Sequence, residues 1–213
     1  MKQYNIEQAK KYLEGLEERD VMAESMKNVL DYLESHRMKG QVMPEYGMIN
    51  MRFGGDKYPL VMKIEFDANR ETASASVAMP AFCVEEKRTV LAELLHRINF
   101  VTVLGEWKFD PRDGECMMKY TQFIGDTPLS LKQAERMVDI SLLSAHMYEE
   151  TIVPMMMGKE PESDNACSEY KAMMGMDDDH SLLRRMLQQA LEAKQKEALE
   201  KNSGDSNSAE TEE

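Results

Sequence analysis

Basic side chains are in short supply in this sequence of 213 residues. It has 26 Lys and Arg against 39 Asp and Glu, which gives a formal net charge of −13. Such a surface repels phosphate groups, so we expect neither nucleic acid nor an anionic membrane as a partner. No apolar run approaches the about 20 residues that a transmembrane helix needs, and the charged first residues predict no signal peptide. We therefore expect a cytoplasmic protein.

Cysteine is scarce as well. The sequence has three, Cys83, Cys116 and Cys167, and no two of them stand at C-x-x-C spacing. An odd and small number without paired spacing disfavours a disulfide framework and a structural zinc site. Because Cys83 and Cys116 lie within apolar patterns, we expect both to fill the core.

The short motifs of common catalytic sites are missing too. There is no G-x-x-x-x-G-K-[ST], G-x-G-x-x-G, G-x-S-x-G or H-E-x-x-H. The densest ligand-like cluster runs from Asp177 to His180, where carboxylates suit a divalent cation but also suit the start of a helix. We interpret it as a helix start, and we predict no catalytic residue, no cofactor, no metal site and no enzymatic activity.

Two further candidates have simpler structural interpretations. Asp113 and Glu115 flank the turn at residues 111–114, where a pair of carboxylates could serve acid–base chemistry. In a Pro-x-Asp-Gly turn the Asp more often stabilises the turn itself. Trp107, the sole tryptophan, is expected in the core rather than in a ligand site.

Apolar spacing predicts an α+β domain over residues 20–158, preceded by an N-terminal helical arm over residues 1–19. Helical spacing alternates with period-two stretches and turn signals. We expect Asp20 and Ser130 to cap helices, and Pro154 with Gly158 to end the last one. The result is an antiparallel five-stranded sheet in the order α-β-β-β-α-β-β-α, with helices at 21–36, 85–100 and 130–153 and strands at 46–53, 60–67, 72–79, 104–110 and 116–120.

Composition changes after Gly158. Residues 159–213 carry 7 basic and 14 acidic side chains. Residues 159–180 have no stable period and are predicted to be a linker, whereas 181–201 has the apolar stripe and charge pairs of an amphipathic helix. The Ser-, Asn- and Glu-rich residues 202–213 are expected to be a disordered acidic tail.

Methionine is abundant, with 20 residues. Two clusters flank the predicted linker, and the flexible thioether suits an adaptable surface for a protein or peptide. Burial by a folded-back tail explains them equally well, so both interpretations stay open. The possible protein-binding residues are Met155, Met156, Met157, Met173, Met174 and Met176.

Several segments resemble the YbjN family of bacterial sensory-transduction regulators. They are residues 91–99 (LAELLHRIN), 104–110 (LGEWKFD), 113–115 (DGE) and 128–130 (PLS). The resemblance covers roughly residues 20–157. It implies a fold similar to type III secretion chaperones, commonly a homodimer that binds extended or helical protein segments, and it brings no catalytic residues.

Three functions follow from these observations. The leading hypothesis is a non-enzymatic protein-binding module, chaperone-like or regulatory, that forms a homodimer. The first alternative is a small-ligand or metal-dependent enzyme that uses Asp177 to His180 or a pocket between the sheet and the helices. The second is a structural or assembly protein that pairs through residues 181–201.

Overall fold

A computed structural model describes residues 2–16, 20–54 and 58–159. By its internal contacts the chain divides into two compact units, Met1–Cys167 and Ser168–Glu213, and the second lies wholly outside the described residues. The predictions for residues 160–213, which cover most of the linker, the amphipathic helix and the acidic tail, also lie outside them. So do Cys167 and the cluster from Asp177 to His180.

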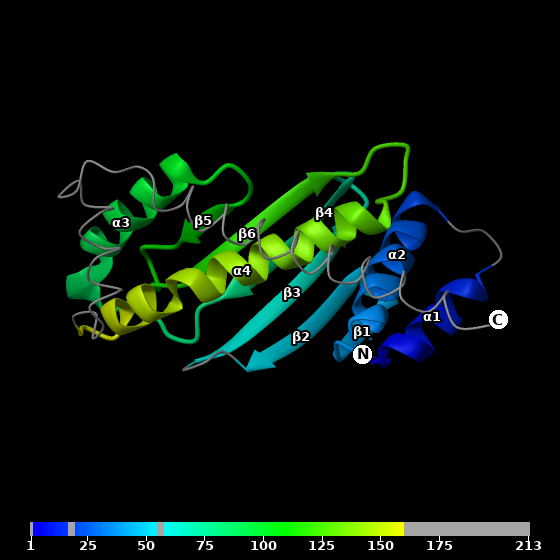
Figure 1. The fold of residues 1–213 in the computed structure, drawn as a ribbon, viewed down its shortest axis with the longest axis horizontal. Coiled ribbons are helices and arrows are strands. Elements are labelled where there is room, and N and C mark those ends of the chain that lie inside the picture. The colour runs from blue at the N-terminus through cyan, green and yellow to red at the C-terminus, as the bar shows by residue number, and fades with distance from the viewer. Residues whose placement is uncertain (1, 17–19, 55–57, 160–213) are drawn as a thin grey trace, which may run out of the picture. The chain divides into compact units, whose positions relative to one another are not determined.

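Helices and strands interleave along the described chain as expected of an α+β fold (Figure 1). No helix within these residues combines the length and apolar content that a membrane crossing needs. The elements are α1 (Ile6–Glu14), α2 (Val21–Ser35), β1 (Gly40–Met43), η1 (Pro44–Tyr46), β2 (Met48–Gly54), β3 (Pro59–Asp67), β4 (Thr72–Ala78), η2 (Glu85–Lys87), α3 (Arg88–Val101), β5 (Glu106–Phe109), β6 (Cys116–Phe123) and α4 (Leu131–Met156).

The strands form one antiparallel sheet in the order β1-β2-β3-β4-β6-β5. The prediction of five strands was wrong, because the structure has a sixth, β1. Its four residues are too few to display a period of two, and Pro44 follows them directly. The segment is a strand because it pairs with β2, with Val42 opposite Ile49.

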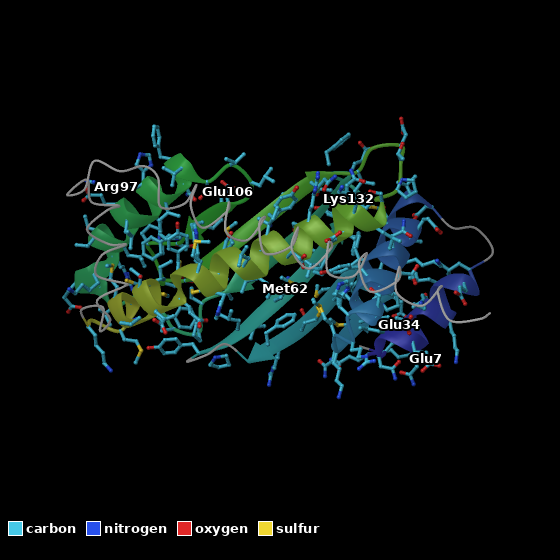
Figure 2. All side chains as sticks on the ribbon, in the orientation of Figure 1. Glu7, Glu34, Met62, Arg97, Glu106 and Lys132 are labelled. Atoms are coloured by element: carbon cyan, nitrogen blue, oxygen red, sulfur yellow. The ribbon has the colours of Figure 1, made fainter. Side chains whose placement is uncertain are left out.

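One face of the sheet is buried, and α2 and α4 lie on it (Figure 1). The inward residues alternate with outward ones, as a period of two requires. In Figure 2, Met62 lies near the middle of the sheet, whereas Arg97 and Lys132 lie at the periphery. The inward residues include Ile49, Met51, Met62, Ile64, Ala75, Val77 and Met118, each no more than 2% exposed.

The predicted caps are present. The Asp20 carboxylate accepts a hydrogen bond from the Ala23 amide at 2.7 Å, and Ser130 forms a capping box with Gln133. Because each cap satisfies backbone donors at a helix start, it sets the position at which α2 or α4 begins.

The prediction that Pro154 ends the last helix was wrong, because it lies inside the last turn of α4. Because proline has no backbone N–H, the helix loses one hydrogen bond there. The carbonyl of Pro154 still accepts from the Lys159 amide at 2.9 Å. The helix ends two residues later, at Met156.

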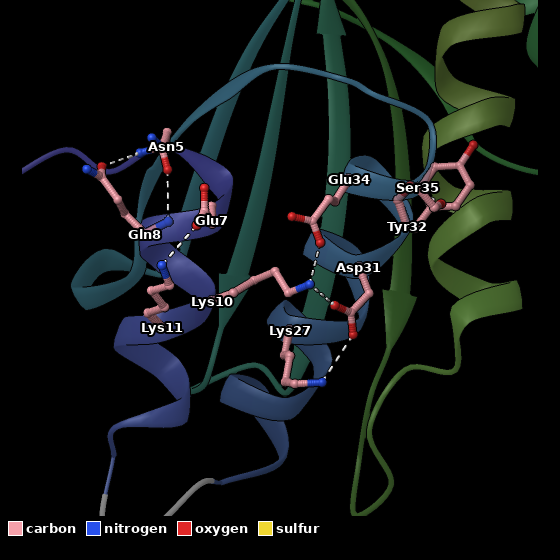
Figure 3. Close-up of polar contacts among 10 residues, drawn as sticks. All are labelled: Asn5, Glu7, Gln8, Lys10, Lys11, Lys27, Asp31, Tyr32, Glu34 and Ser35. Atoms are coloured by element: carbon pink, nitrogen blue, oxygen red, sulfur yellow. Dashed lines mark hydrogen bonds and ion pairs between the residues drawn. The ribbon is translucent and has the colours of Figure 1, made fainter.

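Helix α1 packs against α2 through ion pairs as well as apolar contacts. The Lys10 ammonium lies 2.7 Å from Asp31 and 2.5 Å from Glu34 (Figure 3). Hydrogen bonds to these two carboxylates raise the pKa of Lys10. Since Ala9 and Leu13 are buried beside this cluster, the predicted N-terminal arm packs against the domain.

Both edges of the sheet carry hydrogen bonds from outside it. At the β1 edge, Tyr4 and Val42 exchange two backbone bonds of 2.8 and 2.9 Å. At the β5 edge, the side-chain amide of Asn99 makes two bonds to the backbone of Trp107. Its oxygen accepts from the Trp107 backbone N–H at 2.7 Å, and its nitrogen donates to the Trp107 carbonyl at 3.0 Å. A side chain of α3 therefore takes the place of a further strand.

Replacing Asn99 with Ala should lower the free energy of unfolding by about 1–3 kcal/mol, because two half-buried backbone groups lose their partner. Urea unfolding measures the change. Asn69→Ala in the exposed β3–β4 turn is the matched control and should change stability by less than about 0.5 kcal/mol. Equal losses in the two variants would contradict this role of Asn99.

Candidate protein-binding surface

The methionines at the end of α4 differ sharply in exposure. Met155 is 3% exposed and Met156 0%, so both side chains lie in the core, whereas Met157 is 49% exposed. A protein-binding role for this cluster stays a prediction, and within the described residues it concerns the side chain of Met157. The other candidates, Met173, Met174 and Met176, lie outside those residues.

The backbone after α4 holds Met157 in place. Gly158 has a φ of +78°, which glycine adopts without strain. Its amide donates to the Met155 carbonyl at 3.0 Å, and the Lys159 amide donates to the Pro154 carbonyl at 2.9 Å. These two bonds form a Schellman motif, so the position of Met157 follows from helix termination.

The loop between β4 and η2 lies against this helix end. The Val84 amide donates to the Met156 carbonyl at 2.9 Å, and the Cys83 amide donates to the Gly114 carbonyl at 2.8 Å. Residues 82–84 alternate, with Cys83 buried and Phe82 and Val84 exposed. The loop is therefore bonded on two sides while it presents two apolar side chains outward.

Two residues hold the loop to the β5–β6 turn. Gly114 has a φ of +85°, and a Cβ there would lie 2.5 Å from the Cys83 carbonyl oxygen, so only glycine allows this approach. The Arg88 guanidinium donates to the carbonyls of Cys83, Pro111 and Arg112 at 2.9–3.3 Å. A side chain of α3 thus links the loop to the hairpin.

These bonds place three exposed apolar residues on adjoining backbone segments, and we call them the α4-end surface: Phe82, Val84 and Met157. They are 67%, 37% and 49% exposed. Single exposed apolar residues are common, whereas exposed apolar residues that gather in one area are more typical of an interaction site. The arrangement can bind an apolar side chain; it offers no group for bond making or breaking.

A second exposed apolar group lies where α3 leads into β5. Phe100 is 83% exposed and Val103 85%, and Leu104 follows at 45%. Phe100 also belongs to a helical stripe with Val90, Glu93 and Arg97, of which Arg97 is half-buried and the others are exposed. The spacing i, i+3, i+7, i+10 places all four on one face of α3.

The reactive groups near the α4-end surface are not set up for catalysis. Burial raises the pKa of the Cys83 thiol and raises that of Cys116 to about 12, so neither supplies a thiolate nucleophile near neutral pH. Both are buried core residues, as predicted. The Arg112 guanidinium, by its hydrogen bonds, lowers the pKa of Asp110 to about 2.

The remaining candidates have structural roles. The Asp113 carboxylate accepts from the Glu115 amide at 2.9 Å and so stabilises the turn. Trp107 is 3% exposed and contacts Tyr148 edge-on at 6.0 Å between ring centroids. Among residues 2–16, 20–54 and 58–159, no three His, Cys, Asp or Glu side chains gather closely enough to hold a metal ion.

One feature of the sequence indicates this surface, although the helical and strand periods did not predict it. Residues 80–84 (PAFCV) form a short apolar run between a strand and a helix. In so short a loop, the alternation of buried and exposed residues can be recognised only when the residues that hold the loop are known. Those residues, Gly114 and Met156, lie about thirty and seventy positions further along the chain.

Comparisons with known proteins show distant structural similarity. No protein-family model matches the chain, and no curated protein matches it, so membership of the YbjN family stays a prediction. A chain of the ExsC-ExsE complex matches with a TM-score of 0.45 and 14% identity, over 62% of this chain and 96% of that one. A chain of the HopA1-SchA chaperone-effector complex matches with a TM-score of 0.39 and 17% identity, over 55% and 85%.

Mild oxidation of the folded protein by hydrogen peroxide should convert Met157 to its sulfoxide several-fold faster than Met155 or Met156, because oxidation follows exposure. Peptide mass spectrometry over a time course separates the three sites. In urea, the rates should converge. Equal rates in the folded protein would show that the end of α4 does not present Met157 alone.

Proposed function

We propose that this chain is a non-enzymatic protein-binding module, chaperone-like or regulatory, that works in the cytoplasm as a homodimer. The observation that carries the binding role is the α4-end surface. Its three apolar side chains are exposed, yet the loop that carries Phe82 and Val84 is held by hydrogen bonds with α4, the β5–β6 turn and Arg88. A preorganised apolar surface loses little conformational entropy when it binds.

The chemistry around that surface supports binding rather than catalysis. Its nearest thiol, Cys83, has a raised pKa, and Asp113 is engaged in its own turn. The chaperone-like or regulatory character of the proposal comes from the sequence resemblance to the YbjN family. The acidic composition disfavours a nucleic acid as the partner.

The stripe of α3 supports the homodimer. In an antiparallel contact between α3 and the same helix of a second copy, Val90 lies opposite Phe100 and Glu93 lies opposite Arg97. Each contact then occurs twice, as an isologous interface requires. Glu93 and Arg97 already pair within one helix at 2.7 Å, so the second copy would add charge partners on both sides.

Site-specific photo-crosslinking tests the binding role. A photoreactive amino acid at Phe82 should capture a partner protein in a lysate of the source cells, whereas the same group at the exposed Lys132 of α4 should not. Mass spectrometry identifies the captured chain. Capture at neither position, or the same proteins at both, would contradict the proposal.

Replacing Phe100 with Ser should weaken self-association by at least about tenfold, the loss expected for an aromatic residue central to an interface. Sedimentation equilibrium measures the dimer dissociation constant. Phe123→Ser on β6, where the Phe is 66% exposed, is the matched control and should leave that constant unchanged. A monomeric wild-type protein, or equal effects of the two substitutions, would refute the homodimer.

A further inference from the structure

A concave site of about 380 Å³ opens beside α1, α2 and η1, at the opposite end of the described sheet from β5. Its floor is apolar: Leu13, Met26 and Phe66 line it and are 3%, 2% and 8% exposed. The volume falls in the range of small-ligand and side-chain pockets, about 300–1,000 Å³. We call this site the α1–α2 pocket.

The wall formed by η1 is fixed by backbone geometry. Gly47 has a φ of +60°, and a Cβ there would lie 2.5 Å from the Phe66 carbonyl oxygen. The Phe66 amide donates to the Gly47 carbonyl at 2.7 Å. Since Pro44 begins this short helix, Tyr46 is held beside the pocket with 53% of its surface exposed.

The opposite wall is fixed by the contacts of α1. Lys10 joins α1 to Asp31 and Glu34 of α2 (Figure 3), and the strand-like bridge from Tyr4 to Val42 holds the start of α1 at the sheet edge. The α1–α2 pocket is therefore formed before any ligand arrives, which lowers the cost of binding.

The charges around the α1–α2 pocket indicate which kind of ligand it favours. The described residues that line the pocket include two exposed carboxylates, Asp20 and Glu45, and no cation. Two ammonium groups lie nearby: that of Lys10 is paired with carboxylates of α2, and that of Lys2, within electrostatic range of Glu45, lies over the Tyr4 ring. An apolar floor under an acidic rim complements an apolar side chain flanked by Lys or Arg, and the chain's net charge of −13 favours approach of such a segment.

We propose that the α1–α2 pocket binds an aromatic or branched aliphatic side chain from a basic segment of a partner protein. The proposal rests on the proposed protein-binding function and names the chemistry of one partner segment. It is separate from the α4-end surface, which involves none of the same residues.

Fluorescence anisotropy with two labelled peptides, KLWKLWK and ELWELWE, tests the proposal at low ionic strength. The basic peptide should bind and the acidic one should not. The double variant Asp20→Asn, Glu45→Gln should weaken binding about fivefold, from the loss of two exposed charges. Asn keeps the N-cap of α2, because its side-chain oxygen still accepts from the Ala23 amide.

Two further variants locate the contact. Tyr46→Ser removes an exposed wall of the pocket and should also weaken binding of the basic peptide, whereas Glu86→Gln, an exposed carboxylate of η2, should not. Circular dichroism checks that each variant is folded. Equal binding of both peptides, or no binding of either, would overturn the proposal.

The remaining outcomes separate this proposal from the proposed function. If the basic peptide binds equally to the wild type and all variants, the pocket assignment fails while protein binding stands. If Tyr46→Ser instead dissociates a dimer in sedimentation, the pocket belongs to contact with a second copy, and the proposal fails. A partner captured at Phe82 is independent of either result.

Discussion

The sheet buries only one face, and the rest of the described structure depends on that constraint. Side chains of β2, β3 and β4 alternate, so a single register carries every inward apolar residue to the side that α2 and α4 cover. A shift by one residue would expose Met62 and Ile64 and bury Lys63. Because burial on this face fixes the register, it also fixes the strand ends next to the proposed binding surfaces.

At each edge strand, hydrogen bonds from outside the sheet occupy one residue that a partner strand could otherwise pair with. An open strand edge is a common route for peptide binding, because the partner adds as another strand. Here Tyr4 bonds Val42 at one edge and Asn99 bonds Trp107 at the other. The proposed contacts with a partner use side chains instead, at the α4-end surface, the stripe of α3 and the α1–α2 pocket.

Local sequence patterns predicted most of the helices and strands, whereas the remaining features depend on long-range contacts. Period-two alternation in β3 and the caps Asp20 and Ser130 are local, and their predictions were confirmed. Strand β1 was missed because four residues become a strand only when β2 and Tyr4 pair with them. The α4-end surface was predicted only through Met157, since Phe82 joins it by bonds between residues far apart in the sequence.

Native-state hydrogen exchange of the Val42 and Trp107 amides tests most directly whether the two sheet edges are closed at these positions. These two N–H groups point away from their neighbouring strands and toward Tyr4 and Asn99. If the edges are closed, both amides exchange about as slowly as the Met62 amide in the centre of the sheet. Exchange of either amide at the rate of an unstructured peptide would show an open edge and would contradict the account.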